Sequence, residues 1–307
     1  MSTSVRIAIV QISPERGNPQ ASMRKVDELL AEYTAESGFD ILHLPEMAFT
    51  GYNFRDREDI RPLLEDLCGP TVEWCRFQAQ RLHCSVVCGF PRREKAEDGS
   101  EKVYNSQLVI APNGDVVEVY DKHHLYDADK TWADEGRCFS GDLELPNVPG
   151  VKVGLGICMD INPYEFTAPS TAYEFANFHL QRGTQLVLFS SAWCNSHPDD
   201  QSARKLTLPD LVQTINYWVQ RLTPLVGTDA LFVVANRVGK ESFAPLDREG
   251  EVIFCGASCI LSLKEPALLG LLDTETEMVL VRDVVVPPPR GDTSTLELTS
   301  DGAMSAP

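Results

Sequence analysis

Strand and helix signals alternate along this chain of 307 residues, and that alternation limits the possible folds more than any other feature. Val5 to Ile12 is an apolar, β-branched run of the kind that forms a strand. Asn18 and Pro19 then mark a helix start, and apolar residues recur at helical spacing between Met23 and Tyr33. Because strands that alternate with helices are buried between helix layers, the sequence predicts an α/β layered fold.

The same two patterns continue to residue 286. Strands are predicted over residues 41–44, 85–90, 104–111, 116–120, 152–157, 185–192, 231–237, 243–246, 252–254, 258–263 and 277–286, and helices over 71–83, 172–181 and 211–222. Turn residues 112–115 and 247–250 each join two of these strands into a hairpin, so the sheets are expected to be mixed. One domain is predicted over residues 1–290, followed by a polar tail over 291–307 that is expected to be disordered.

Composition excludes several classes of protein. Hydrophobic residues make up 43% of the chain, which is too much for a disordered polypeptide. The formal net charge of −18 disfavours binding to nucleic acid or to anionic membranes, because both interactions depend on Lys and Arg. The sequence has no apolar run of about 18 residues and no secretory or transit signal, so we expect a cytoplasmic protein.

Nine cysteines are present, an odd number, and most of them lie in apolar runs. Two pairs have C-x-x-x-C spacing, Cys84 with Cys88 and Cys255 with Cys259. Structural zinc more often uses C-x-x-C pairs with a second pair of ligands, and residues four apart on a strand share a face. We therefore expect reduced thiols that are mostly packed in the core, no metal site and no cofactor.

Three polar side chains interrupt the apolar pattern, each just after a predicted strand. These residues are Glu46, Lys122 and Cys158, and strand ends in α/β proteins face the crevices where ligands bind. A carboxylate, an ammonium and a thiol together can form a covalent catalyst. Glu46 would take the thiol proton, while Lys122 would lower the pKa of Cys158 and hold the developing oxyanion. Taken singly, Lys122 would more often be a solvated surface lysine, Glu46 a solvated or helix-capping carboxylate, and Cys158 a buried thiol.

Three motifs in a fixed order resemble the signatures of a known family. Residues 44–52 (LPEMAFTGY), 120–125 (YDKHHL) and 154–160 (GLGICMD) are similar to those of the nitrilase superfamily, the carbon–nitrogen hydrolases. The resemblance continues through residues 233–237 and 254–258, so it covers nearly the whole chain.

The resemblance implies both a fold and a set of catalytic residues. The family's four-layer α-β-β-α sandwich of two mixed sheets agrees with the predicted elements, and its catalytic triad falls on Glu46, Lys122 and Cys158. Family members often have a second glutamate after the lysine. Here Asp129 matches the spacing better, and Glu135 is the alternative. Either carboxylate would keep Lys122 protonated, and either could instead be a solvated loop acid.

Two adjacent histidines offer a competing interpretation. A cysteine protease needs a Cys–His pair, and His123 and His124 follow Lys122 directly. The order glutamate, lysine, cysteine argues against a protease. A histidine packed into the wall of the site, or simply exposed, is the simpler interpretation.

Two segments point to a substrate within the family. Residues 47–54 and 159–166 resemble the protein N-terminal amidases of fungi. Those enzymes deamidate N-terminal asparagine and glutamine to aspartate and glutamate and release ammonia. They act in an N-degron pathway. The resemblance implies a hydrolase whose partners are peptide or protein N-termini bearing Asn or Gln, and which acts as a monomer or homodimer. A free small-molecule amide or nitrile is an alternative substrate. A catalytically inactive binding protein is the alternative of another class.

Four residues are candidates for substrate binding. Asp160 could hold the α-ammonium of the substrate by a charge-assisted hydrogen bond, or it could brace the turn within the fold. Tyr52 and Trp193 could form the pocket wall or be packed core residues. Met159 lies between the expected nucleophile and Asp160.

Overall fold

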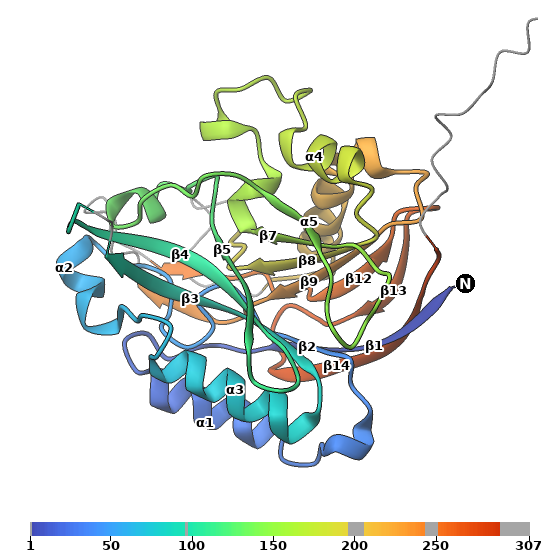
Figure 1. Cartoon of the computed structure of the whole chain (residues 1–307). Coiled ribbons are helices and arrows are strands. Elements are labelled where there is room, and N and C mark those ends of the chain that lie inside the picture. Colours follow the sequence, from blue (N-terminus) through green and yellow to red (C-terminus); the bar gives the residue numbers. More distant parts are fainter. Residues whose placement is uncertain (1, 96–97, 196–205, 243–250, 289–307) are drawn as a thin grey trace, which may run out of the picture.

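The computed structural model describes residues 2–95, 98–195, 206–242 and 251–288. Two six-stranded sheets pack face to face, and helices cover the outer face of each sheet (Figure 1). Within these ranges the helices are α1 (Pro19–Leu29), α2 (Arg57–Ile60), α3 (Pro70–Leu82), α4 (Glu174–Arg182) and α5 (Leu208–Arg221). Because α1 and α3 lie on one side of the sandwich and α4 and α5 on the other, the predicted four-layer α-β-β-α order is confirmed (Figure 1).

Both large sheets are mixed, as the sequence predicted. The first has the order β14 (Met278–Val286), β1 (Thr3–Gln11), β2 (Ile41–His43), β3 (Ser85–Lys95), β4 (Glu101–Ile110), β5 (Val116–Asp121). The second has the order β13 (Ala267–Leu271), β12 (Cys259–Ser262), β9 (Leu231–Asn236), β8 (Leu186–Ser191), β7 (Val153–Ile157), β6 (Ser140–Leu143). A small ribbon of β10 (Lys240–Ser242) and β11 (Glu251–Ile253) accompanies them.

At one edge of the first sheet, strands from the two ends of the described chain pair with each other. Thr3 pairs with Val286 and Gln11 with Met278, so β14 runs antiparallel to β1 along its whole length. On its other side β1 pairs in parallel with the short strand β2. The strand that leads to Glu46 is therefore an interior strand of the sheet.

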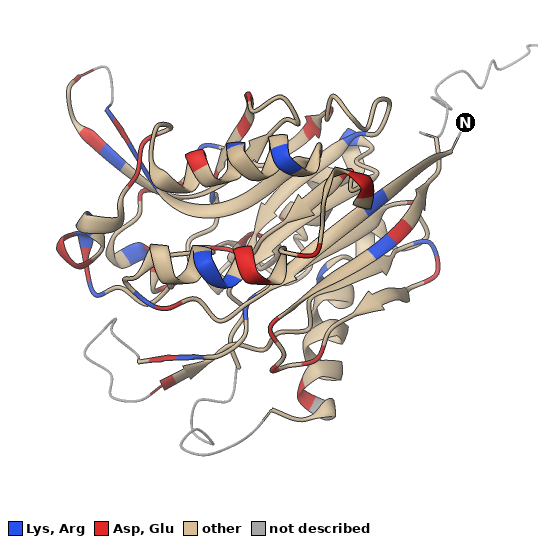
Figure 2. Ribbon diagram, turned by 90° about the horizontal axis from the view of Figure 1, so that it is seen from below, with Lys and Arg blue, Asp and Glu red and all other residues tan. Residues whose placement is uncertain are grey.

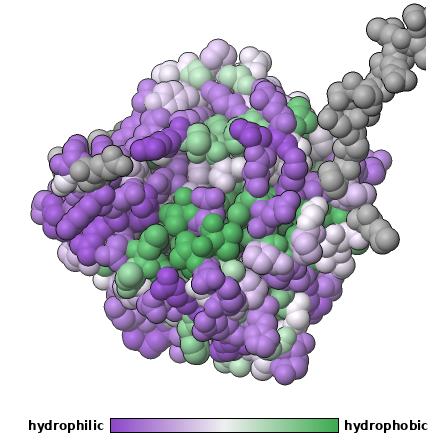
Figure 3. All heavy atoms as spheres, in the orientation of Figure 1, coloured by the Kyte–Doolittle hydropathy of each residue, from purple (hydrophilic) through white to green (hydrophobic). Residues whose placement is uncertain are grey.

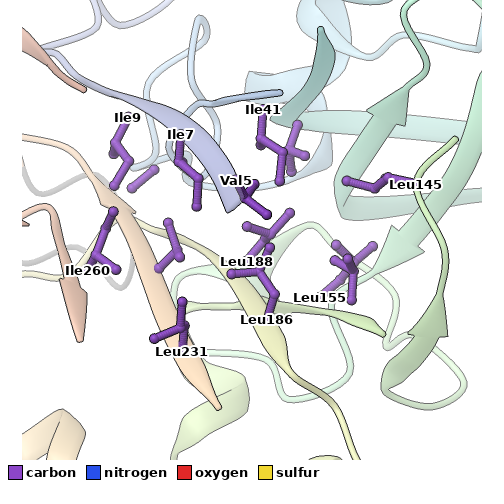
Figure 4. Packing of buried hydrophobic residues seen from close by; sticks show 14 of the residues in the cluster. Val5, Ile7, Ile9, Ile41, Leu145, Leu155, Leu186, Leu188, Leu231 and Ile260 are labelled. Atoms are coloured by element: carbon purple, nitrogen blue, oxygen red, sulfur yellow. The ribbon is translucent and has the colours of Figure 1, made fainter. Parts of the chain in front are cut away.

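Apolar side chains fill the space between the two sheets (Figure 4). Ile7 and Ile9 of β1 point into this layer, where Leu188 of β8 meets them from the second sheet. Ala8 and Val10, the alternate residues of β1, pack instead in the layer beneath α1 and α3. This alternation follows from the two-residue period of a strand, and it buries both faces of the sheet.

Local sequence signals explain where two helices begin. α1 begins as predicted, because the side chain of Asn18 accepts a hydrogen bond from an N–H of the first turn and Pro19 is the first helical residue. The helix predicted to start at Thr71 begins one residue earlier, at Pro70, whose fixed φ suits the first helical position. Thr71 donates from its N–H and its hydroxyl to Glu65, at 2.8 and 2.7 Å.

One predicted hairpin is confirmed, and the other is described only in part. β4 and β5 pair in antiparallel around residues 111–115. β10 and β11 also pair in antiparallel, but the strand predicted over 243–246 and the turn that follows it lie outside the described residues. The tail predicted over 291–307 lies outside them as well.

Charged residues lie mainly on helices, loops and strand ends (Figure 2). The face seen in Figure 3 is largely hydrophilic, with an apolar area in the region that β5 crosses in Figure 1. The valines of β5 are only partly buried there, because β5 is an edge strand. None of the described helices is both long enough and apolar enough to cross a membrane.

Candidate active site

The three polar residues singled out at strand ends lie at one end of the sandwich. Glu46 comes shortly after β2, while Lys122 follows β5 and Cys158 follows β7 directly. β2 and β5 belong to the first sheet and β7 to the second. The site is therefore built across the junction of the two sheets.

Lys122 lies between two buried carboxylates. Its Nζ donates hydrogen bonds to Glu46 Oε1 at 2.7 Å and to Asp129 Oδ2 at 2.5 Å. The side-chain amide of Asn105 bridges the same carboxylates, donating to Glu46 at 2.7 Å and to Asp129 at 3.0 Å. Burial by itself would lower the pKa of Lys122, but Asp129 and Glu46 outweigh burial and hold that pKa above its ordinary value. The amine therefore stays charged in the interior.

The structure separates the two candidate supporting acids. Asp129 is fully buried, and beyond Lys122 it accepts hydrogen bonds from the Tyr126 N–H at 3.0 Å and the Tyr52 hydroxyl at 3.2 Å. Glu135 lies at the surface with a side chain 40% exposed, and it accepts a hydrogen bond from Tyr164. The acid beside Lys122 is thus the one that matched the spacing better.

Cys158 lies on a sharp turn at the end of β7. Its φ of +41° falls in the left-handed region that few L residues adopt, and it opens a short 3-10 helix, Cys158–Ile161. The sulfur lies beside the hydroxyl of Ser191 and the N–H of Ala192 at the end of β8. Because that N–H also donates to Glu46 Oε2 at 2.7 Å, one backbone group lies between the thiol and the carboxylate.

The thiol is not a resting thiolate. Burial and the charge of Glu46 raise the pKa of Cys158 well above its ordinary value, and the opposing effect of Lys122 is smaller. Lys122 does lower the pKa of Cys158, as expected, but burial and Glu46 outweigh its effect. Burial likewise raises the pKa of Glu46, which makes its carboxylate a stronger base. This arrangement suits transfer of the thiol proton to Glu46 during attack.

A glycine on β3 sets the position of Glu46. A Cβ atom on Gly89 would lie 2.6 Å from both the Glu46 Cα and the Pro45 carbonyl oxygen. The Gly89 N–H donates to that carbonyl at 3.1 Å, and the Ala48 N–H donates back to the Gly89 oxygen at 2.9 Å. A larger residue at this position would push the turn off β3 and move Glu46 away from Lys122.

Comparison with known proteins decides the family. The family model described as Carbon-nitrogen hydrolase matches residues 6–193. The chain belongs to the carbon-nitrogen hydrolase family. A protein N-terminal amidase of Schizosaccharomyces pombe is 33% identical over 299 residues, which cover 91% of this chain and 99% of that protein. A protein N-terminal amidase of Saccharomyces cerevisiae is 31% identical over 212 residues, which cover 63% of this chain and 46% of that protein.

Solved structures share the fold of this carbon–nitrogen hydrolase. A crystal structure of an N-terminal amidase with an Asn-Glu-Ala peptide has a TM-score of 0.77 at 20% identity, covering 93% of this chain and 98% of that chain. A carbon–nitrogen hydrolase superfamily protein from Xanthomonas campestris has a TM-score of 0.64 at 22% identity, covering 92% and 91%. These similarities confirm the two-sheet fold implied by the sequence motifs.

Asp160 braces this carbon–nitrogen hydrolase from inside. One carboxylate oxygen accepts from the N–H groups of His124 and His123, at 2.8 and 3.1 Å. The other accepts from the Ile157 N–H and the Tyr120 hydroxyl, both at 2.7 Å. These four donors use the acceptor capacity of one carboxylate, and the side chain is fully buried. The expectation that Asp160 binds an α-ammonium is therefore replaced by its alternative, a brace for the turn after β7.

The other substrate-binding candidates have different surroundings. Tyr52 is 3% exposed and reaches the triad through Asp129. Met159 is 2% exposed, and its sulfur accepts a hydrogen bond from the Asn162 amide at 3.4 Å. Trp193 is partly buried against aromatic rings of α5. Tyr52 thus contacts the charged network around Lys122 through its hydrogen bond to Asp129.

The two histidines after Lys122 bind main-chain carbonyls. His123 Nδ1 lies 2.8 Å from the Gly136 oxygen, and His124 Nδ1 lies 3.0 Å from the Asn162 oxygen. Burial lowers the pKa of His124, so its ring is kept neutral. These contacts fit the interpretation of histidines in the wall of the site.

Sequence reasoning missed two contributors to the site. Asn105 opens a polar run, Asn105–Gln107, inside an otherwise apolar strand, and that signal could have identified it. Ala192 contributes only its backbone N–H, which no side-chain pattern reveals.

Within the part of the chain that the structure describes, no three His, Cys, Asp or Glu side chains are grouped to hold a metal ion.

Proposed function

We propose that this carbon–nitrogen hydrolase deamidates N-terminal asparagine and glutamine of polypeptides to aspartate and glutamate and releases ammonia. The observation that carries the proposal is the 33% identity to the fission-yeast protein N-terminal amidase, because it extends over 91% of this chain and 99% of that enzyme. The buried carboxylate, ammonium and thiol support the chemistry, since they are the groups that covalent amide hydrolysis needs.

In the first half-reaction, the Cys158 sulfur attacks the side-chain amide carbon while Glu46 takes the thiol proton. Negative charge develops on the amide oxygen, and the Lys122 ammonium stabilises it. Glu46 then passes its proton to the amide nitrogen, the carbon–nitrogen bond breaks, and ammonia leaves. The acyl group remains on the sulfur as a thioester.

In the second half-reaction, Glu46 takes a proton from water, and the oxygen of that water attacks the thioester carbon. The carbon–sulfur bond breaks, and the proton returns to Cys158. The product side chain is a carboxylic acid, so asparagine becomes aspartate and glutamine becomes glutamate. Asp129 keeps Lys122 charged throughout, because it is hydrogen-bonded to the ammonium.

Three peptides test the substrate. The first begins with Asn, the second is the same peptide N-acetylated, and the third has Asn at its third position. Ammonia release and conversion of amide to acid are measured with the native enzyme, with Cys158→Ala, and with Cys138→Ala as a matched control at an exposed cysteine. We expect turnover of the Asn-first peptide alone, by the native enzyme and Cys138→Ala.

Other outcomes would move the assignment. Similar rates on all three peptides would contradict recognition of the N-terminus. A preference for free glutamine over every peptide would make the protein a small-molecule amidase. No release from any amide or nitrile by the folded native chain would favour an inactive binding protein.

The cellular setting is part of the same proposal. The products, N-terminal aspartate and glutamate, would feed an N-degron pathway. We place the enzyme in the cytoplasm as a monomer or homodimer. Its nine cysteines, all free, support a reducing compartment.

A further inference from the structure

A buried ion pair lies next to the site, outside the residues matched by the family model. Arg237 follows β9, and Glu241 lies in β10. The Arg237 Nη1 lies 2.5 Å from Glu241 Oε1, and the two side chains are 0% and 3% exposed. Burying two charges this deeply is costly unless each is paired. The catalytic steps above use neither residue.

The Glu241 carboxylate organises the segment that follows Glu46. It accepts hydrogen bonds from the Tyr52 N–H at 3.0 Å, from the Asn53 N–H at 3.0 Å and from the Asn53 amide at 3.3 Å. Gly51 makes room for it, because a Cβ there would lie 2.9 Å from Glu241 Oε1 and the backbone φ is +81°. Residues 51–53 thus form a cradle shaped around one carboxylate.

Tyr52 connects this cradle to the catalytic lysine. Its hydroxyl donates to Asp129 Oδ2 at 3.2 Å, the same oxygen that accepts from Lys122. The Lys122 Nζ also lies 5.6 Å from the centre of the Tyr52 ring. Tyr52 therefore joins the Tyr126 N–H and the Asn105 amide in holding Asp129 against Lys122.

The other side of Tyr52 is fixed by the same ion pair. The Phe254 ring packs edge-on against Tyr52, with centroids 6.2 Å apart. The Arg237 guanidinium lies over Phe254, its Cζ 3.9 Å from the ring centre. The Glu241 carboxylate thus holds the backbone of Tyr52, and Arg237 supports the ring against which Tyr52 packs.

We propose that Glu241 is a positioning residue for the hydrolysis reaction, acting on Lys122 through Tyr52 and Asp129. Arg237 neutralises its charge and completes the packing. The reactivity of Cys158 then depends on residues that lie more than 70 positions further along the chain. This proposal rests on the proposed function only in the experiments that measure peptide turnover.

A double-mutant cycle tests this coupling. Glu241→Gln keeps the shape of the side chain and removes its charge, and Tyr52→Phe removes only the hydroxyl bond to Asp129. Each single change should lower kcat about tenfold, the effect expected for a hydrogen bond to a charged group. The double variant should be no slower than the slower single variant, because both changes break the same path. Effects that multiply to about a hundredfold would overturn the proposal.

A matched control separates positioning from general loss of a buried acid. Glu65 is also buried and accepts backbone and hydroxyl hydrogen bonds, but from Thr71 at the start of α3. Glu65→Gln should leave kcat near the native value and should combine additively with Tyr52→Phe. If Glu241→Gln does not fold, as judged by thermal melting, Glu241→Asp replaces it, because that variant keeps the charge opposite Arg237.

A second readout needs no substrate. The alkylation rate of Cys158 by iodoacetamide, followed by mass spectrometry of its peptide, reports the state of the thiol directly. Glu241→Gln and Tyr52→Phe should change this rate by the same factor, and the double variant should change it no further. If the native enzyme fails to hydrolyse the peptides while the two substitutions still show coupled effects on the alkylation rate, the proposed substrate is refuted. The positioning role of Glu241 is not refuted by that result. Independent effects on alkylation would refute the positioning role.

Discussion

Lys122→Met would test the electrostatics of the site most directly. It removes the cation that lies between Glu46 and Asp129, and it keeps an unbranched side chain of similar length. The surroundings are fully buried, so little water is available to replace the lost charge. The two carboxylates would then face each other across the gap.

The size of the effect follows from the geometry. Lys122 Nζ is 2.7 Å from Glu46 Oε1 and 2.5 Å from Asp129 Oδ2, so these two oxygens are no more than about 5 Å apart. Two negative charges at about 5 Å, in a medium with an effective dielectric constant of about 20, repel by about 3 kcal/mol. That energy corresponds to a rise of about 2 units in the pKa of one carboxyl group.

The free energy of unfolding of the variant should therefore depend strongly on pH. A carboxyl group whose pKa is raised in the folded state contributes stability below its unfolded pKa, near 4, and loses it as pH rises through the folded value. Burial and Asp129 already raise the pKa of Glu46 in the native protein, and loss of Lys122 leaves the repulsion between the two carboxylates uncompensated. Between about pH 5 and 8, the free energy of unfolding of Lys122→Met should fall by about 3 kcal/mol more than that of the native protein.

Urea unfolding at the two pH values measures this difference. Lys152→Met serves as the control, because Lys152 is exposed immediately before β7, and it should follow the native protein at both values. If the free energy of unfolding changes with pH in the same way for Lys122→Met and the native protein, the expected repulsion between the two carboxylates is refuted. That result would mean that the carboxylates are solvated or farther apart once the lysine is gone.

Three further predictions concern the same site. Cys158→Ala should abolish ammonia release by several orders of magnitude and leave the melting temperature near the native value, and residual turnover near native would exclude it as nucleophile. Asp129→Asn should lower kcat about a hundredfold or more, whereas Glu135→Gln at the surface should change it less than about twofold; kinetics with the reverse order would reassign the supporting acid. Asp160→Asn should lower the free energy of unfolding by about 1–3 kcal/mol in urea, because buried donors lose their acceptor, and an unchanged value would argue against the brace.

The sequence was informative where chemistry coincides with a strand end. Glu46, Lys122 and Cys158 each follow an apolar strand, and the sheets bring such ends together irrespective of loop detail. The layered fold could be predicted for the same reason, since two periodicities alternate along the chain. Asp129 remained one of two options because its place depends on the path of a loop, and loop geometry carries no periodic signal.

Main-chain donors and burial decide what the sequence left open. The sequence left two roles open for Asp160, and main-chain N–H groups, which supply three of its four hydrogen bonds, favour the brace. Lys122 lowers the pKa of Cys158 as expected, yet burial and Glu46 raise it by more. Main-chain donors and burial depth are properties of the folded chain that residue types do not display.

The pairing of β1 with β14 has a consequence for synthesis on the ribosome. β1 emerges first, yet its partner strand ends at Val286, near the end of the described chain. At about 5–20 residues per second, the nascent chain carries β1 with one edge unpaired for roughly 15–60 seconds. Glu46, Lys122 and Cys158 have all emerged while that edge is still open to other chains. Ending translation before Met278 would make this exposed state permanent, and it would leave a polypeptide that holds the triad but tends to aggregate.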